Sequence, residues 1–542
     1  MTTTWKILVD WDRTGDFDES YDDITNYVIN AKWYLGFSQP YAHVANDSTL
    51  DLVLNNTDGR FSPENSSSPL SGKLLPLRPV RIISDDGTME RIHWTGWLQT
   101  LMPFGGRYGQ RHVQMSAAGA MQFLKAAETK IELQEDKRTD EVIDTLISEV
   151  VFPPSVLKGG FLDTAGFQNV GTDEATGDAE AYIIDMDDIR VLDEGAVTLG
   201  IAADNWVSDG GFADRPKDTF DVYRGIKDMV ATELGKFFFD RQGRAIFFNR
   251  QRLLQPYTPD ATFNDTMQSL KYTYGSTELL KNEIIVTCHP RTISDSDQDI
   301  LWQLDGSVIR VPANDTRELY IKYEDDSENR IGGREVTIGD LAFQQGTATA
   351  TVDAKANGAN LIFTNNSNTE AIVSECIVRG RRIVDSGYME ASSKDNTSVV
   401  TYGRRTLRIN LPSMEDLDSA QSIADFELIR RKDPIGQIQA ITTVSHGKRG
   451  GNQHTDQLAR TIRDIVRVNE TQTGHNKDHI IIGEAHELGE AATYLKSTWY
   501  LEPITEGNWA FVDDSVDAPK VYGDGTESPD PYTPYEAYIV TA

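Results

Sequence analysis

Hydrophobic and polar positions alternate through much of the first 118 residues, as they do in strands that bury one face. Leu50, Leu52 and Leu54 occupy every second position, and the dipeptide Asp58-Gly59 follows as a turn signal. The same alternation recurs between positions 80 and 115. The pattern predicts a compact antiparallel β-barrel over residues 1–118.

Helical spacing replaces this alternation in residues 119–255. Thr139 is placed to cap a helix whose apolar positions fall within 142–150. A second helix has its apolar stripe within 222–234, and Gly235 is placed as the residue after its last turn. Because a β-hairpin pattern follows the second helix, we expect a small α+β lobe here.

A β-type sequence returns in residues 256–503. The run 284–286 is apolar without alternation, which favours a strand buried on both faces. Segments rich in threonine, valine and alanine near 310–410 indicate a β-rich insertion. One helix interrupts the strands, because Ser413 and Asp416 have the spacing of a capping box before an apolar stripe. The fold class is therefore mainly β with α+β insertions.

Residues 504–542 form a distinct acidic segment that is rich in proline and tyrosine. It has almost no periodicity, and Lys520 is its single basic residue. Its prolines oppose a regular helix or a central strand. Its aromatic residues lead us to expect an extended C-terminal arm that orders on a neighbouring subunit, and a flexible acidic tail is the alternative.

The 542-residue chain is strongly acidic, with a formal net charge of -32. This charge repels phosphates at long range, which argues against stable nucleic-acid binding. The acidic residues comprise 53 Asp and 31 Glu, whereas only 20 Lys accompany 32 Arg. An Asp-rich, Lys-poor composition resembles that of proteins from halophilic organisms, and an acidic mesophilic protein is the other interpretation.

The sequence predicts neither a disulfide framework nor a membrane segment. Cys288 and Cys376 are too few for a disulfide scaffold or a multi-cysteine zinc site. No run approaches the ~20 apolar residues of a membrane span, and the first residues lack the apolar core of a secretion signal. We therefore expect synthesis in the cytoplasm and no transmembrane segment.

An acidic loop near the N-terminus is the candidate for metal binding. Asp10, Asp12, Asp16 and Asp18 are spaced like the oxygen ligands at the start of a calcium loop. The twelfth position is Tyr21 instead of the bidentate glutamate of that loop. The sequence therefore assigns no metal ion here, and a solvated acidic turn competes with a calcium site.

Catalytic motifs find no support in the sequence. His486 is followed by glutamate as in a zinc-protease helix, but Glu490 stands where the second histidine belongs. His475 and His479 are four positions apart, yet neighbouring glycine and asparagine place them in a loop, where we expect satisfied or solvent-facing imidazoles. Nucleophile-elbow and phosphate-loop patterns are missing as well. We predict no catalytic residue and no cofactor.

Three N-terminal segments resemble the opening barrel of tail-tip, or baseplate hub, proteins of tailed viruses. They are VDWDRTGDFD at 9–18, LVLNNTDGRFSPEN at 52–65 and LLPLRPVRI at 74–82. The order and spacing of these segments match the family across about a hundred residues.

Later segments are similar to other parts of the same family. The stretch 204–250 resembles its middle lobe, and the stretches 282–286 and 423–434 resemble its second barrel. The segment DIVRV at 464–468 resembles its closing strands, with Arg463 where the family usually has glycine. The resemblance implies two tube-like β-barrels per chain, at 1–118 and within 256–503.

The resemblance also implies a function as a structural virion protein. Such a hub continues the tail tube as a homotrimer, connects it to host-recognition components and gives a passage for genome ejection. The implied partners are a tail tube or distal tail protein, a tape-measure protein, and receptor-binding or fibre proteins. The alternatives are a tail-associated hydrolase of the cell envelope, which would need a catalytic motif, and a secreted surface-binding β protein.

Overall fold

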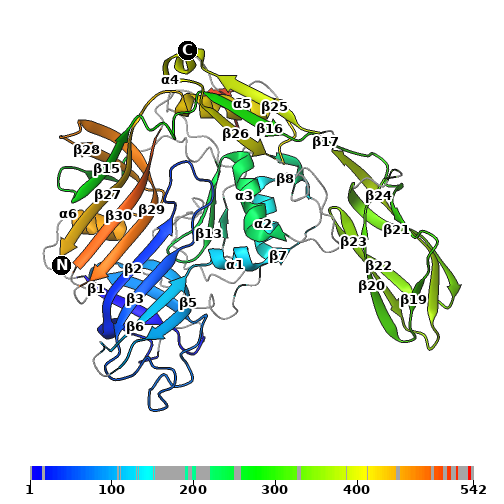
Figure 1. The fold of residues 1–542 in the computed structure, drawn as a ribbon, viewed down its shortest axis with the longest axis horizontal. Coiled ribbons are helices and arrows are strands. Elements are labelled where there is room, and N and C mark those ends of the chain that lie inside the picture. The colour runs from blue at the N-terminus through cyan, green and yellow to red at the C-terminus, as the bar shows by residue number, and fades with distance from the viewer. Residues whose placement is uncertain are drawn as a thin grey trace.

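The structure, a computed structural model, is built mainly from β-strands (Figure 1). It describes residues 3–14, 17, 19–106, 109, 111–129, 131, 134–150, 152, 190–192, 198–202, 220–249, 258–325, 327, 331–385, 387–411, 413–446, 452–489, 494–504, 510–513, 520–522 and 535–538.

The largest part of the described fold is a single twelve-stranded sheet. Its strands are β1 (Thr4–Val9), β2 (Val28–Gly36), β3 (Thr49–Asn55), β4 (Pro79–Asp85), β5 (Glu90–Pro103), β6 (His112–Ala118), β14 (Ala261–Phe263), β15 (Ser269–Tyr274), β27 (Gly436–His446), β28 (Ile465–Glu470), β29 (His475–Gly489) and β30 (Tyr494–Pro503). They pair in the order β1-β4-β5-β6-β3-β2-β29-β30-β27-β15, with β28 on β29 and β14 on β28.

Strand β2 joins the two halves of this sheet. It pairs antiparallel with β3 on one side and with β29 on the other, so N-terminal and C-terminal strands lie side by side (Figure 1). Because β2 pairs with β29 instead of returning toward β1, the described strands form an open path and close neither of the two expected barrels. The β-rich fold class is confirmed at this coarser level.

The alternation predicted for the first half corresponds to its core. Leu50, Leu52 and Leu54 of β3 all point inward, where they belong to a buried cluster that also contains Trp11 and Trp94. The same cluster continues into the helices of the next lobe. The first half of the sheet and the α+β lobe therefore share one hydrophobic core.

In the described part of residues 119–255, the lobe after this half contains three helices and several short strands. They are α1 (Met121–Ala126), β7 (Glu128–Thr129), β8 (Gln134–Arg138), α2 (Thr139–Ser148), β9 (Arg190–Leu192), β10 (Thr198–Ala202), β11 (Phe220–Asp221), α3 (Val222–Glu233), β12 (Lys236–Phe239) and β13 (Ala245–Phe248). Strands β12 and β13 form the expected hairpin, and α2 packs against α3.

One of the two predicted helix ends in this lobe is wrong by one residue. Arg138, not Thr139, is the N-cap of α2, because its backbone N–H donates to the Glu141 carboxylate at 2.9 Å and Thr139 is already helical. At the end of α3, Gly235 follows the C-cap residue as predicted, and the C-cap Leu234 adopts the left-handed conformation, with φ of 58°. Gly235 is required there for space, since a side chain would meet the ring of Phe247.

A further part of the fold consists of one small sheet and the helix that covers it. Strand β16 (Glu283–Cys288) lies between β25 (Met389–Lys394) and β26 (Thr406–Leu411), with α4 (Asn396–Tyr402) between the last two in sequence. Helix α5 (Leu417–Arg431) packs on β16 and β25. The buried run predicted for 284–286 is thus the centre of this sheet.

The start of α5 differs from its prediction. Asp416 itself is the N-cap, and its carboxylate accepts N–H groups from Asp418 and Ser419. Ser413 is not part of a capping box. Ala420, Ile423 and Ala424 form the buried face of the helix, and Leu417 in its first turn is exposed.

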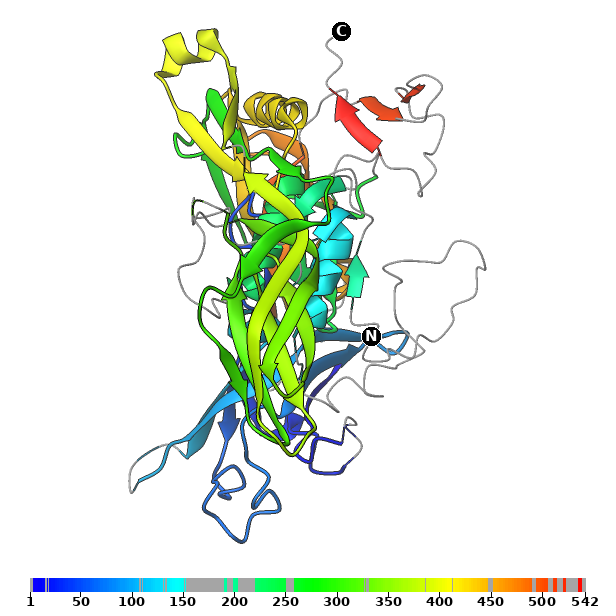
Figure 2. The same ribbon diagram turned by 90° about the vertical axis from the view of Figure 1, so that its right-hand side faces the viewer.

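The β-rich insertion forms a lobe of its own, which projects at the right-hand side of Figure 1 and faces the viewer in Figure 2. Its strands are β17 (Arg291–Ile293), β18 (Asp299–Gln303), β19 (Ile309–Val311), β20 (Asp315–Lys322), β21 (Gly332–Gln345), β22 (Thr349–Lys355), β23 (Gly358–Asn365) and β24 (Ala371–Asp385). They make two sheets around a separate buried cluster that includes Tyr323 and Phe363.

The remaining elements lie toward the C-terminus, apart from the short 3-10 helix Thr25–Tyr27. Helix α6 (Asn452–Ala459) packs on β27. In the predicted arm, β31 (Ala510–Asp513), β32 (Lys520–Tyr522) and β33 (Tyr535–Tyr538) form a small antiparallel sheet. No helix within the described ranges is long and apolar enough to span a membrane.

The turn before β28 contains a residue other than glycine at a position with a positive φ. Arg463 has a φ of 92°, a conformation that glycine favours, and its N–H donates to the Ile481 carbonyl at 2.7 Å. Its guanidinium lies over the ring of Phe248. Arginine is therefore accommodated at the position where the resembling family usually has glycine.

Candidate functional site: the buried charged junction and the sheet face

Arg241 inserts from the β12–β13 hairpin into the C-terminal half of the large sheet. Its guanidinium donates to both carboxylate oxygens of Glu484 on β29, at 2.7 and 2.5 Å. It also donates to the carbonyls of Leu458 and Arg460, at 3.2 and 2.6 Å. The Glu484 side chain is fully buried, so this bidentate pair fastens the lobe to the sheet in a dry environment.

The electrostatics of this pair are those of a stable buried ion pair. Burial alone would raise the pKa of the Glu484 carboxyl, but Arg241 outweighs burial and lowers the pKa to about 2. The Nε2–H of His486 donates to the same carboxylate at 3.1 Å, and its Nδ1 accepts from the Ser497 hydroxyl at 2.9 Å. Burial lowers the pKa of His486, so the imidazole is neutral near pH 7.

A serine, a histidine and a carboxylate are hydrogen-bonded in a row here, as in a hydrolase triad. These residues, Ser497, His486 and Glu484, are however buried inside the sheet. Their exposed fractions are 0%, 3% and 0%, so a substrate has no access to the serine. Both ring nitrogens of the histidine are already hydrogen-bonded, one to each of these neighbours. This arrangement orients side chains inside the sheet and offers no nucleophile to the surface.

Glu502 on β30 is the centre of a second buried cluster. It accepts the Tyr41 N–H at 2.7 Å, the Lys236 ammonium at 2.9 Å and the Arg430 guanidinium at 3.2 Å. Burial alone would raise the pKa of Glu502, yet Lys236 and Arg430 lower it to about 2. The carboxylate thus connects β30 to the hairpin strand β12 and to helix α5.

Helix α5 carries a further acidic partner in the same cluster. Glu427 accepts from Arg430 at 2.9 Å and from Arg431 at 2.5 Å. Both guanidinium groups also lie over the ring of Tyr41. The ion pairs lie within the helix and the ring contacts are cation–π contacts, and together they hold Arg430 in the orientation that reaches Glu502.

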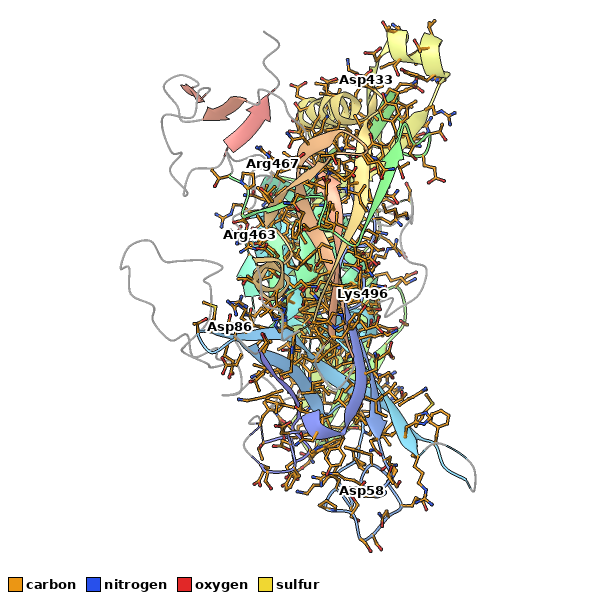
Figure 3. All side chains as sticks on the ribbon, turned by 90° about the vertical axis from the view of Figure 1, so that its left-hand side faces the viewer. Asp58, Asp86, Asp433, Arg463, Arg467 and Lys496 are labelled. Atoms are coloured by element: carbon orange, nitrogen blue, oxygen red, sulfur yellow. The ribbon has the colours of Figure 1, made fainter. Side chains whose placement is uncertain are left out.

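A row of charged side chains crosses the point where the two halves of the sheet meet. Register places Asp51 opposite Lys32, Lys32 opposite Glu487, and Glu487 opposite Lys496, so the four lie in one line over β3, β2, β29 and β30. The Lys32 ammonium is 3.1 Å from the Glu487 carboxylate. Lys496 lies near the middle of the molecule, far from Asp58 and Asp433 at its two ends (Figure 3).

The same face continues with small polar residues. Ser116 of β6 is opposite Asp51, and its hydroxyl contacts the Thr100 hydroxyl of β5 at 2.5 Å. On the next row, Thr498 and Thr442 are joined by a 3.0 Å hydrogen bond. Across both halves the face therefore carries opposite charges and hydroxyl side chains, together with the rings of Tyr34 and Tyr500.

The predicted metal loop is only partly within the described residues. The Asp10 carboxylate accepts the Thr14 N–H at 3.2 Å, and the Asp12 carboxylate pairs with the Lys73 ammonium at 2.7 Å and with the Tyr21 hydroxyl. Asp16 and Asp18 lie outside the described residues. In the part of the chain that is described, no group of three or more His, Cys, Asp or Glu residues is arranged to hold a metal ion.

The prediction for His475 and His479 is wrong. Both lie on β29, not in a loop, and both are buried. Burial and the neighbouring His475 lower the pKa of His479 to about 4. Pairing with β28 extends β29 back to the glycine turn, and this places both imidazoles inside.

Sequence reasoning did not find the functional charges of the junction. The hairpin that carries Arg241 is predicted from the sequence, but its partner Glu484 is 243 positions away. Neither residue belongs to a motif, and a charged residue in a turn ordinarily faces water. Only the register of β2 on β29 and the docking of the hairpin bring the two together.

The buried histidines predict a loss of stability in acid. His93 is fully buried and contacts the Ser84 hydroxyl at 2.7 Å. Burial, and then the charge of Arg241, hold its pKa well below 6.5. The unfolded chain therefore binds a proton near pH 6.5 that the folded chain does not, and stability falls as pH drops below that value, by up to about 1.4 kcal/mol per pH unit.

Urea unfolding between pH 7.5 and 5 measures this effect. His93→Gln is expected to make the decline in unfolding free energy shallower. His446→Gln, at an exposed position on β27, is expected to keep the wild-type decline. An identical decline in His93→Gln and wild type would contradict the assignment.

Comparisons with known proteins give structural neighbours only. No family model matches the chain, and no curated protein matches its sequence. Among solved structures, the chain is similar to a tail protein from Neisseria meningitidis, with 9% identity, 93% of this chain and 97% of that chain covered, and a TM-score of 0.46.

Two further solved structures have comparable similarity. A 43 kDa tail protein of prophage MuSo2 from Shewanella oneidensis has 9% identity, with 92% of this chain and 98% of that chain covered and a TM-score of 0.45. A prophage tail protein from Listeria monocytogenes has 8% identity, with 93% and 95% covered and a TM-score of 0.37. All three of these neighbours are tail proteins.

Proposed function

We propose that this protein is a structural component of a virus tail, a hub at the tail tip that continues the tail tube as a homotrimer. The observation that carries the proposal is the single sheet that runs without interruption across both halves of the chain. One chain then supplies two neighbouring segments of a tube wall. The N-terminal segments that resemble hub proteins lie in the first of these halves.

The side chains on the sheet face support a role for this face as the wall of a channel through which DNA passes. A wall on which DNA slides must avoid strong attraction to phosphates, and the lysine at the centre of the charged row, Lys32, is already paired with Glu487 at 3.1 Å. The net charge of -32 repels phosphates at longer range. Short hydroxyl side chains elsewhere on the face make hydrogen bonds to one another.

The two halves of the large sheet are the reason that we propose a trimer. A six-fold tube continued by a chain with two wall segments closes with three copies, and closed cyclic symmetry leaves no unmatched interface. In this role the hub would contact the tail tube or distal tail protein, the tape-measure protein, and receptor-binding or fibre proteins. The acidic surface also fits a virus of a halophilic host.

The hydrolase alternative has no comparable support. The described residues that come nearest to a triad, Ser497, His486 and Glu484, are buried in the sheet. The arrangement fits a scaffold whose charged groups fasten its parts together.

Copy number tests the proposal. Quantitative mass spectrometry of purified particles, with the major tube protein as reference, is expected to give three copies of this chain per tail, and cryo-electron microscopy is expected to place them in one ring at the tip. Six copies in one ring would contradict the two-segment arrangement. Absence of the chain from purified tails would contradict the tail function itself.

A further inference from the structure

Two histidines at the start of β29 have an unusual environment. The ring centroids of His475 and His479 are 5.1 Å apart, with the rings tilted by 38°. Their exposed fractions are 6% and 0%. The Nε2 atom of each ring is buried and has no hydrogen-bond partner. Buried nitrogen atoms without a partner are costly, so two of them on adjacent rings call for a shared ligand.

The orientation of His479 prepares its Nε2 as a ligand. Its Nδ1 lies 3.2 Å from the Lys477 carbonyl, which can only accept a hydrogen bond. Nδ1 therefore carries the proton, and Nε2 has a free lone pair. Histidines that bind metals are commonly held in this way, with the second ring nitrogen donating to a backbone carbonyl.

The separation of the rings fits a shared metal ion. Two imidazoles on one tetrahedral ion, with metal–nitrogen bonds of about 2.0–2.1 Å, have their ring centroids about 5 Å apart. We propose that His475 and His479 bind one divalent transition-metal ion of the zinc type through their Nε2 atoms. Because no third His, Cys, Asp or Glu residue joins them among the described residues, water molecules complete the coordination.

Access and surroundings are consistent with such a site. His475 directly follows the exposed turn at 471–474, and His479 lies four residues further along the strand. The ring of Tyr272 on β15 packs edge-on against His475, with centroids 5.6 Å apart. An ion held here would fasten the β28–β29 turn where it packs against the outermost strand of the C-terminal half. The inference is independent of the proposed tail function.

Zinc titration of the full chain tests the site. After treatment with a chelator and dialysis, isothermal calorimetry with Zn²⁺ alone is expected to show one ion bound per chain. His475→Gln and His479→Gln are each expected to weaken binding about 10-fold or more. His446→Gln, which changes an exposed histidine, is expected to bind as the wild type does. Thermal melts of all three variants establish that they are folded.

Copper provides a second measurement that does not depend on the variants. Electron paramagnetic resonance of the wild type with one equivalent of Cu²⁺ is expected to show hyperfine coupling to two imidazole nitrogens. Failure of Zn²⁺ to saturate, coupling to a single nitrogen, or binding that is lost in His446→Gln and kept in the other two variants would overturn the proposal. A buried water shared by the two rings would then account for the unpartnered nitrogens.

Discussion

Replacing Arg241 with methionine is expected to lower the free energy of unfolding by about 3–5 kcal/mol, because it leaves the Glu484 carboxylate buried without its cation. Methionine keeps most of the side-chain volume, so the loss reports the charge and its hydrogen bonds more than packing. Four hydrogen bonds disappear with the guanidinium. Urea unfolding followed by tryptophan fluorescence measures the change.

Two variants make this result specific. Arg408→Met removes an exposed ion pair with Glu390 on the small sheet and is expected to cost less than about 1 kcal/mol. The double variant Arg241→Met with Glu484→Gln also removes the buried carboxylate charge that the single variant leaves unpaired, and it is expected to regain part of the stability. An effect of Arg241→Met no larger than that of Arg408→Met would show that the buried pair does not fasten the lobe to the sheet.

Glu502→Gln is expected to have the second large effect, a loss of about 3 kcal/mol or more, because Lys236 and Arg430 then lack their shared anion. The side chains of Lys236 and Arg430 are 7% and 14% exposed, so water compensates little. Since the pKa of Glu502 is lowered to about 2 in the folded protein, its contribution is present above pH 4.5. It is lost as pH falls from there toward 2.

Glu487→Gln is the matched control for this prediction. Glu487 also pairs with a lysine, Lys32, but in an exposed row on the sheet face, and its loss is expected to cost less than about 1 kcal/mol. Both changes replace one glutamate by glutamine in the same half of the sheet. Equal destabilisation by the two would contradict the importance of burial at Glu502.

Both large effects have a common physical basis. Each buried carboxylate accepts hydrogen bonds from more than one element, so the cost of removing its charge from water is compensated by several partners. The partners come from the hairpin, helix α5 and the sheet. These charges therefore favour one arrangement of the parts over others, which hydrophobic contact alone does less specifically.

Local pattern was enough to identify several individual elements. The alternation of Leu50, Leu52 and Leu54 matches the buried face of β3, and the apolar run at 284–286 matches the central strand β16. These predictions succeed because burial of one face, or of both, leaves a period in the sequence itself. Helix ends were less accurate, since a cap depends on which of two neighbouring polar residues turns toward the backbone.

The histidines and the charged junction show where local pattern fails. Glycine and asparagine beside His475 are typical of a loop, yet pairing with β28 makes the segment a buried strand. The hairpin turn at Arg241 has the composition of a solvated turn, yet it is buried against β29. In both cases a contact between distant segments outweighs the local preference.

The sequence by itself determined that the chain is mainly β, where its principal strands and helices lie, and that its surface is strongly acidic, because these properties follow from residues close together in the chain. Only the tertiary structure decided that β2 pairs with β29 to make one open sheet, that Arg241 meets Glu484, and that His475 and His479 are buried together. Such contacts join residues whose separation along the chain leaves no periodic signal, and their stability depends on exclusion of water, which arises only when the parts have packed.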